Sequence, residues 1–174
     1  MQIEIEQLTE TGRPFAHTYT PEELSLEDER ARLRTAAHVA GRASRKRQRV
    51  HVRGTIETEL EVACDRCLVP LVVPVKTEFD VSYDPPDAEE ETDSAELQAE
   101  DLETTIYTGE SLDLDELVRE QILLALPTRN LCREACQGLC PTCGVNLNTQ
   151  TCACEQQEID PRWAGLAALK NRDE

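Results

Sequence analysis

The protein is a chain of 174 residues, of which 39% are hydrophobic and 30% are charged. This length fits one domain with a small appendage and argues against a multi-domain enzyme. Asp and Glu number 35 and Lys and Arg number 18, which gives a formal net charge of −17. The overall field of such a protein repels nucleic acid, so any basic patch would have to act locally.

Residues 1–83 are predicted to form an antiparallel β domain. Its clearest signal is the alternation of apolar and polar residues in two segments, Val50 to Cys64 and Val69 to Tyr83. Met1 to Leu8 and Ala31 to Val39 alternate more weakly and could add further antiparallel strands. We therefore expect an α+β fold built on a small antiparallel sheet, with a barrel-like sheet as the alternative.

The two strong segments are expected to form a hairpin. A two-residue turn at Asp65 and Arg66 would pair residues whose numbers sum to 131, so that inward-facing residues of both strands meet. In this register Pro70 and Pro74 fall at non-hydrogen-bonded sites. That side of the hairpin tip should then be an edge of the sheet.

An acidic linker and a helix are predicted next. Residues 84–110 are rich in Asp and Glu and contain almost nothing to bury, which is typical of a solvated, flexible linker. Residues 111–130 contain a helix that packs on the sheet, with Asp113 and Glu116 as a capping box and Pro127 as its stop. The apolar positions that recur at helical spacing are Leu114, Leu117, Val118, Ile122 and Ala125.

Residues 131–174 are predicted to be a Cys-rich zinc-binding segment of knuckles followed by a short terminal helix. Asp160 can cap this helix, with Pro161 at its first position. Its apolar stripe would be Trp163, Leu166 and Leu169.

Cysteine is the most informative residue type in the chain. The eight cysteines form four close pairs: Cys64 and Cys67, Cys132 and Cys136, Cys140 and Cys143, and Cys152 and Cys154. Ligand pairs separated by a few residues are typical of structural zinc sites, which take four thiolates in a tetrahedron. Four pairs therefore predict two Zn²⁺ ions per chain, each closed by four protein ligands and without an open position for catalysis.

Spacing also indicates which pairs share a metal. The last two pairs are separated by only eight residues, which favours one local site made of Cys140, Cys143, Cys152 and Cys154. The other site would then combine Cys64, Cys67, Cys132 and Cys136, and would tie the hairpin tip to the segment that follows the helix. Two alternatives stay open: some cysteines are ordinary thiols, or four of them hold an iron–sulfur cluster.

Four stretches of the sequence resemble the YceD family of large ribosomal RNA subunit accumulation proteins. They are CDRC at 64–67, DLDELVREQILLALP at 113–127, LCREACQGLCPTCGVNLN at 131–148 and CACEQQEIDPRWAGLAALK at 152–170. The resemblance implies a role in the accumulation or processing of large-subunit ribosomal RNA, with no established catalytic activity. Family members that lack the last two cysteine pairs keep the hairpin pair, which supports the proposed pairing.

A basic stripe is predicted on the outward face of the first hairpin strand. Its candidate nucleic-acid-binding residues are Arg45, Arg47, Arg49 and Arg53, with His51 among them. The alternative is cross-strand pairing, because the predicted register places Arg53 opposite Glu78, His51 opposite Asp80 and Arg47 opposite Asp84. No aromatic residue interleaves with the stripe, so contact with RNA would be electrostatic rather than by base stacking.

The expected function is that of a non-enzymatic zinc-binding factor that supports accumulation of large-subunit (23S) ribosomal RNA. It would bind ribosomal RNA or a large-subunit ribosomal protein within a pre-ribosomal particle. No nucleotide-binding, hydrolase or metalloprotease motif occurs in the sequence, and His17, His38 and His51 have no metal-like neighbours. We therefore expect no small-molecule substrate.

Two other function classes compete with this expectation. One is a redox-regulated zinc chaperone, in which oxidation of the site between Cys140 and Cys154 releases the metal. The other is an adaptor that uses the acidic linker as its contact surface. The sequence shows no apolar secretory segment and no run near the ~18 residues of a membrane span. We expect reduced thiols in the cytoplasm, or in the plastid stroma after import.

Overall fold

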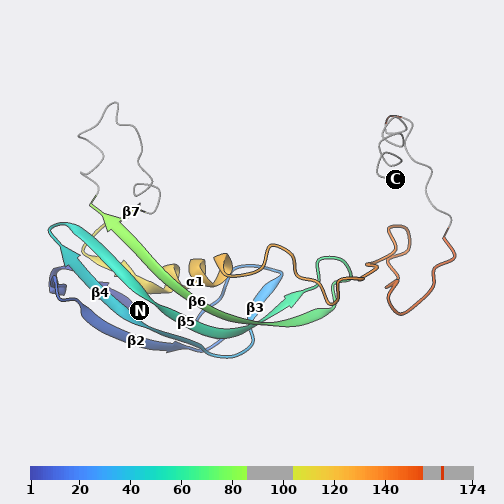
Figure 1. Ribbon diagram of the computed structural model, residues 1–174, viewed down its shortest axis with the longest axis horizontal. Coiled ribbons are helices and arrows are strands. Elements are labelled where there is room, and N and C mark those ends of the chain that lie inside the picture. Colours follow the sequence, from blue (N-terminus) through green and yellow to red (C-terminus); the bar gives the residue numbers. More distant parts are fainter. Residues whose placement is uncertain (86–103, 155–161, 163–174) are drawn as a thin grey trace.

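The computed structural model describes residues 1–85, 104–154 and 162, and Figure 1 shows an elongated, curved sheet with a helix against it. The elements in chain order are β1 (Gln2–Glu4), the 3₁₀ helix η1 (Ile5–Gln7), β2 (Arg13–Tyr19), β3 (Ala31–Leu33), β4 (Ala37–Lys46), β5 (Arg49–Ala63), β6 (Pro70–Asp84), β7 (Thr104–Ile106), β8 (Ser111–Asp113) and α1 (Leu114–Leu124). Six strands form one sheet in the order β2-β4-β5-β6-β7, with β3 beside β5, and β1 pairs with β8 separately.

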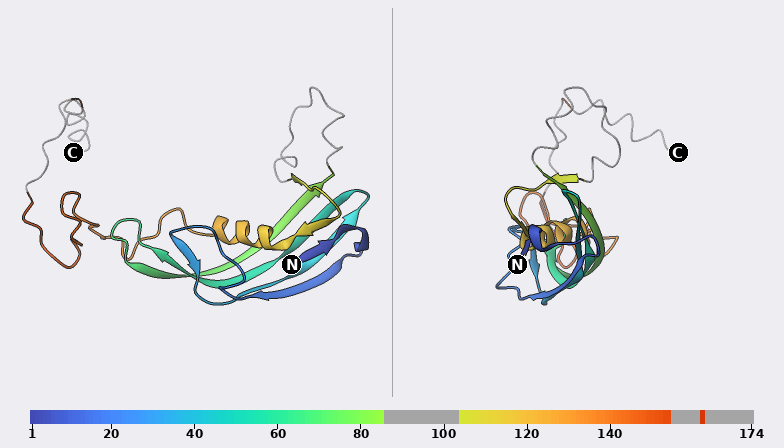
Figure 2. Two further views of the ribbon diagram at one scale, coloured as in Figure 1. Left: turned by 180° about the vertical axis from the view of Figure 1, so that it is seen from behind. Right: turned by 90° about the vertical axis from the view of Figure 1, so that its left-hand side faces the viewer.

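The main sheet is open and mixed. Its first five strands pair antiparallel, whereas β7 runs parallel to β6 at Ser82–Asp84. The expectation of a purely antiparallel sheet is therefore wrong, and so is the barrel-like alternative, because the outer strands β2 and β7 do not pair. The sheet curls around α1 instead, as the end-on view in Figure 2 shows. The helix occupies the concave side of the sheet.

The hairpin of β5 and β6 carries most of the core, as its alternation predicted. Each strand is 15 residues long, and the inward side chains of β5 that are fully buried are Val50, Val52, Ile56 and Leu60. Val75 and Phe79 of β6 belong to the same apolar cluster. Continuous burial along one face of two long strands makes this hairpin the framework on which the other elements pack.

The register of the hairpin differs from the prediction by two residues. Ala63 pairs with Pro70, and Arg53 lies opposite Asp80 rather than Glu78. The connection is a longer knuckle over residues 64–69 instead of a two-residue turn, with Leu68 at φ +59°. Its backbone is closed by the N–H of Leu68 donating to the Cys64 carbonyl at 2.9 Å. A shift of two residues keeps every side chain on its predicted face.

The two prolines of β6 lie at non-hydrogen-bonded positions of the hairpin, as predicted. Pro70 is opposite Ala63 and Pro74 is opposite Glu59. The backbone groups of Ala63 and Glu59 hydrogen-bond on the other side of β5, to residues 30–34. The nitrogen of each proline therefore faces the outer side of β6. Its missing N–H costs no hydrogen bond between β6 and β5.

A row of two glycines covered by two phenylalanines crosses the sheet. Phe15, Gly41, Gly54 and Phe79 are successive partners on β2, β4, β5 and β6. A Cβ atom on Gly54 would lie 2.6 Å from the carbonyl oxygen of Ala40 and 2.9 Å from the Phe79 ring. The glycines thus permit a close approach of the strands, and the rings fill the space above them.

The N-terminal strands were only partly predicted. Met1 to Leu8 contains β1, which pairs with β8 rather than with the main sheet. The segment Ala31 to Val39 divides into β3 and the start of β4. β2 was not predicted, because its side chains are mostly exposed or half-buried and Pro14 interrupts the pattern. An edge strand of this kind lacks the apolar alternation that reveals a strand in sequence.

Helix α1 begins where the sequence predicted and covers the sheet. The Asp113 carboxylate caps it by accepting a hydrogen bond from the backbone N–H of Asp115 at 2.9 Å. The buried helix residues are Leu114, Leu117, Val118 and Ile122. Tyr19 of β2 donates a hydrogen bond to Asp115 at 2.6 Å, and burial together with the Asp115 carboxylate raises the pKa of Tyr19 far above its usual range. The helix start is thereby tied to β2.

Two predicted segments lie mainly outside the described residues. Most of the acidic linker assigned to residues 84–110 falls at 86–103, although Thr104–Ile106 forms β7. The terminal helix expected after Asp160 also lies outside them. No helix in the described parts of the chain is long and apolar enough to cross a membrane.

We predict that Gly54→Ala destabilises the protein by about 2–3 kcal/mol, because the added methyl group meets the Ala40 carbonyl and the Phe79 ring in a packed core. Urea denaturation would measure this. Thr55→Ala, a neighbouring change on the exposed face, should cost less than about 1 kcal/mol. Equal losses for the two variants would show that the glycine row is not required for close strand approach.

Candidate metal centres

The eight cysteines form two groups of four. Cys64, Cys67, Cys132 and Cys136 make up the inner cluster, and Cys140, Cys143, Cys152 and Cys154 make up the outer cluster. Within each cluster the four sulfur atoms lie within 4.8 Å of one another. These are the two sets that the spacing in the sequence favoured. Cys64 and Cys67 lie at the tip of the β5–β6 hairpin, and the other six cysteines lie in the segment that follows α1, which Figure 1 shows extending past that tip.

The inner cluster joins two distant parts of the chain. Cys64 and Cys67 lie on the knuckle between β5 and β6, and their sulfur atoms are 3.9 Å from Cys136 Sγ and 3.6 Å from Cys132 Sγ, respectively. Four thiolates around one Zn²⁺ at ~2.3 Å would lie ~3.8 Å apart at the corners of a tetrahedron. The observed separations fit a single ion, whereas a cluster of several iron atoms would hold its thiolates farther apart.

Hydrogen bonds fix the two parts of the inner cluster to each other. The backbone N–H of Asp65 donates to the Asn130 carbonyl at 2.8 Å, and the N–H of Asn130 donates to the Asp65 carboxylate at 2.6 Å. Arg66 Nη1 donates to the Cys136 carbonyl at 2.6 Å. Leu139 then donates its N–H to the Arg66 carbonyl at 3.1 Å. These hydrogen bonds therefore join the hairpin tip to the segment that follows α1 on both sides of the inner cluster.

The surroundings of the inner thiols favour thiolates at some positions and oppose them at others. Burial raises the pKa of Cys64, but the backbone N–H groups of Arg66, Cys67 and Cys132 outweigh it and bring the pKa to about 6. The neighbouring Cys136 thiolate raises the pKa of Cys132 to about 12. Four thiolates at this distance repel one another, so a divalent cation is what would allow all four to ionise.

The outer cluster is built from one local stretch of chain. Its knuckle is closed by the N–H of Gly144 donating to the Cys140 carbonyl at 2.9 Å, with Gly144 at φ +73°. Cys140 Sγ and Cys152 Sγ are 3.3 Å apart. The backbone N–H groups of Cys143 and Thr142 lower the pKa of Cys140 to about 6. Cys140 is buried, whereas Cys143 is exposed, so this cluster is the more accessible of the two.

Asn148 connects the two clusters and was not identified from the sequence. It follows the outer knuckle, yet its side-chain amide donates to Cys136 Sγ of the inner cluster at 3.4 Å. Its carbonyl oxygen accepts hydrogen bonds from Gln137 N–H at 2.9 Å and from Arg133 at 2.8 Å. An asparagine twelve residues from its partner carries no spacing signal, because the contact exists only once both knuckles have formed.

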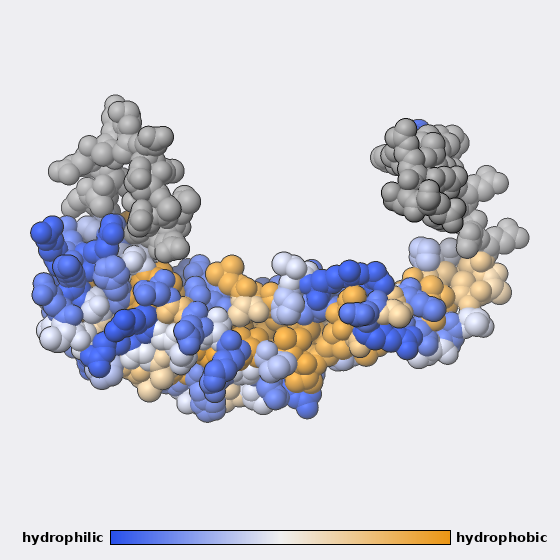
Figure 3. Space-filling view, viewed as in Figure 1, coloured by the Kyte–Doolittle hydropathy of each residue, from blue (hydrophilic) through white to orange (hydrophobic). Residues whose placement is uncertain are grey.

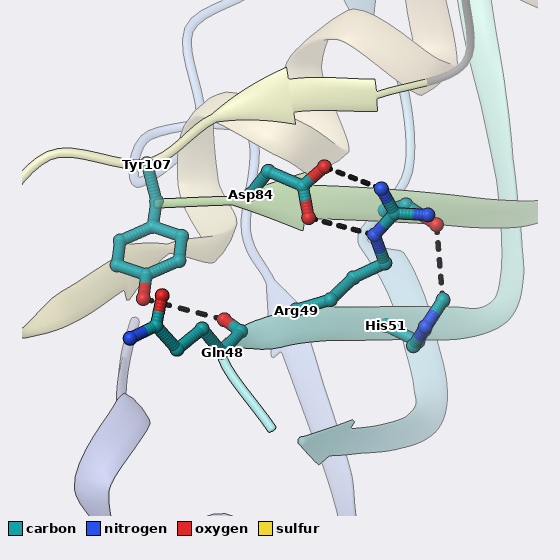
Figure 4. Close-up of polar contacts among 6 residues, drawn as sticks. Gln48, Arg49, His51, Asp84 and Tyr107 are labelled. Atoms are coloured by element: carbon teal, nitrogen blue, oxygen red, sulfur yellow. Dashed lines mark hydrogen bonds and ion pairs between the residues drawn. The ribbon is translucent and has the colours of Figure 1, made fainter. Parts of the chain in front are cut away.

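The predicted basic stripe is not a single strand face. β4 and β5 meet at a two-residue turn, so Arg45 lies on β4, Arg47 lies in the turn, and only Arg49 and Arg53 lie on β5. Because the chain reverses at this turn, Arg45 pairs with the buried Val50 of β5. Paired residues of antiparallel strands lie on the same face of a sheet, so Arg45 is not on the face that carries Arg49 and Arg53. Arg47 does not face Asp84 as predicted. The bond is made by Arg49, whose Nε and Nη2 donate to the two Asp84 oxygens at 2.7 and 2.6 Å (Figure 4).

We predict that Cys64→Ser lowers the free energy of unfolding by at least ~3 kcal/mol and more than Cys152→Ser does, because the inner cluster closes a long loop and the outer cluster a short one. Chemical denaturation and metal analysis of the purified proteins would measure this. Wild type should contain two zinc ions, one for each cluster, and Cys152→Ser should retain the inner one. Equal destabilisation by the two variants would contradict the structural role of the inner cluster.

A second prediction concerns Asn148. Asn148→Ala should weaken zinc binding at the inner cluster about 10-fold or more, because a hydrogen bond to a ligand sulfur is lost. Competition with a coloured chelator would measure the affinity of each site. Gln150→Ala is the control, since that side chain is exposed nearby. A loss confined to the outer cluster would show that Asn148 does not couple the two sites.

Comparison with known proteins places these clusters in a family. Residues 52–170 match the family described as "Large ribosomal RNA subunit accumulation protein YceD". An uncharacterized protein of Mycobacterium tuberculosis is 33% identical over 120 residues, which is 69% of this chain and 55% of that protein. The Zea mays protein named "Large ribosomal RNA subunit accumulation protein YCED homolog 1, chloroplastic" is 27% identical over 84% of this chain and 56% of its own length.

The relatives differ in length. This chain spans about half of the mycobacterial and maize proteins, whereas a Bacillus subtilis relative, the uncharacterized protein YlbN, is 27% identical over 98% of this chain and 95% of its own length. No solved structure matches the chain. The family match covers more than half of the chain and includes all eight cysteines, and the protein therefore belongs to the YceD family.

Proposed function

We propose that this protein is a non-enzymatic, zinc-binding factor that supports the accumulation and processing of large-subunit (23S) ribosomal RNA during ribosome assembly. It acts in the cytoplasm by binding ribosomal RNA or a large-subunit ribosomal protein. The observation that carries the proposal is the family match over residues 52–170, which spans both cysteine clusters.

The donor set supports zinc as the resident metal. Each cluster offers four thiol sulfurs and no carboxylate or imidazole, and soft thiolate ligands in a tetrahedron are typical of structural zinc. Two such ions, one in each cluster, would hold the knuckles in place. With four protein ligands, neither ion has a position for water or substrate, which supports a structural rather than a catalytic role.

The contacts around the thiols favour this role over that of a redox-regulated chaperone. Such a chaperone must expose apolar surface when its metal leaves. The outer cluster is the accessible one, but the apolar side chains packed on thiols surround the inner cluster: they are Leu71, Leu131 and Leu139. Oxidation of the outer cluster, in which two thiols form a disulfide while peroxide is reduced to water, would uncover little of that surface.

Deletion of the gene should lower the amount of mature large-subunit ribosomal RNA relative to small-subunit RNA and increase large-subunit precursors, as measured by primer extension and gel analysis of total RNA. Expression of the wild-type protein should restore the ratio. A Cys64→Ser/Cys67→Ser variant should not restore it, because the inner cluster is lost, and Thr55→Ala should restore it as a matched control. Unchanged precursor and mature RNA in the deletion strain would refute the proposed function.

A further inference from the structure

Basic side chains are distributed unevenly along the main sheet. Toward the β5–β6 tip they are neutralised by acids, in the pairs Arg32–Glu61, Arg34–Glu59 and Lys76–Glu57. At the opposite end, where β4 and β5 meet, Figure 3 shows a strongly hydrophilic surface. Among the described residues, no carboxylate lies within ion-pair distance of Arg45, Lys46, Arg47 or Arg53. In a protein of net charge −17, the described part of this end therefore carries a group of basic side chains without acidic partners there.

The turn between β4 and β5 holds an unusual residue. Lys46 pairs with Arg49, which leaves Arg47 and Gln48 as the two turn residues, all four exposed. Arg47 has φ +59°, in the left-handed region where Gly or Asn is preferred in hairpin turns. An arginine at such a position costs stability, and strained residues of this kind are concentrated at functional sites. The strained backbone of Arg47 therefore marks this turn as a candidate binding site.

The turn is braced by contacts that leave the Lys46 and Arg47 side chains available. Arg45 Nε donates to the Arg47 carbonyl at 3.0 Å, and the Tyr107 hydroxyl donates to the Gln48 carbonyl at 3.3 Å. The bidentate ion pair between Arg49 and Asp84 holds the start of β5 against the end of β6 (Figure 4). Both turn carbonyls are thus satisfied from neighbouring elements, and the backbone that carries the two cations is fixed in advance.

An open hollow of about 730 Å³ lies beside the turn. It is lined by the four turn residues Lys46, Arg47, Gln48 and Arg49 together with His51, Asp84 and Pro85. Lys46 and Arg47 are thus two exposed cations on neighbouring positions of one turn at the edge of a hollow. The guanidinium of Arg47 can contact a phosphate through two hydrogen bonds, and the ammonium of Lys46 acts as a point charge.

We propose that the turn formed by Lys46, Arg47, Gln48 and Arg49 binds the phosphate backbone of ribosomal RNA. This inference rests on the proposed function and assigns its RNA contact. A ribosomal protein fits the turn less well, because most such proteins are basic and the turn would repel them. Contacts of this kind with phosphate groups are electrostatic and independent of base sequence.

Binding of a fluorescently labelled large-subunit ribosomal RNA fragment, followed by anisotropy over a series of salt concentrations, tests the proposal. Lys46→Gln/Arg47→Gln should weaken binding about 10-fold or more near 0.1 M salt and reduce the slope of log K against log salt by about 1–2. Arg30→Gln/Arg34→Gln removes the same charge near the other end and should change affinity less than about 2-fold. Equal losses for the two variants would overturn the assignment.

A second variant separates contact with RNA from support of the turn. Arg47→Gly removes the cation and also relieves the left-handed strain. It should therefore weaken RNA binding while melting at or above the temperature of wild type. A lower melting temperature would mean that the Arg47 side chain stabilises the turn, and unchanged RNA affinity would mean that it does not contact RNA. Either result would overturn the proposal.

Complementation of the deletion strain distinguishes this inference from the proposed function. If the deletion lowers large-subunit RNA and Lys46→Gln/Arg47→Gln restores it as well as wild type does, the turn assignment fails while the proposed function stands. If the deletion has no effect on RNA, the proposed function fails and the binding data alone decide on the turn. Loss of a co-purifying ribosomal protein with unchanged RNA affinity would identify the turn as a protein contact and overturn the RNA assignment.

Discussion

The structure depends on the tip of the β5–β6 hairpin, which must present two thiols to a segment more than sixty residues away in the chain. This constraint explains why the strands are joined by a knuckle rather than by a tight turn. Residues 64–69 turn backbone N–H groups toward the sulfur of Cys64 and place Asp65 against Asn130. Since α1 leads directly to Asn130, the hairpin register, the helix position and the inner cluster are fixed together.

Charge follows the long axis of the molecule. Toward the thiol clusters, glutamates on β5 form ion pairs with Arg32 of β3, with Arg34 just after β3 and with Lys76 of β6. At the far end, the acid that faces β5 is committed to Arg49 and leaves the turn residues positive. The thiol clusters and the basic turn are thus separated by the length of the sheet, so that charges at the two ends are screened from each other at physiological salt.

The elements that depend on local sequence signals were predicted correctly. Alternation predicted β5 and β6, Asp113 predicted the start of α1, and close spacing grouped the cysteines correctly into two sets. The register could not be predicted, because it depends on a left-handed Leu68 in the knuckle.

β7 and Asn148 escaped prediction for a related reason. The partners of both are distant in sequence, and neither sits in an apolar pattern of its own. The prediction that the basic residues share one strand face was wrong. The turn at Arg47 contains neither Gly nor Asn, so no local signal indicated that the chain reverses there.

The prolines of β6 have a consequence for self-assembly. Among the described strands, only β7 pairs with the outer side of β6, and only at Ser82–Asp84. The rest of this long strand would be a template for fibril growth by edge-to-edge stacking. Pro70 and Pro74 remove two of the outward N–H donors from that edge, and Lys76 adds a charge beside them. These residues therefore oppose the formation of intermolecular sheets through this edge.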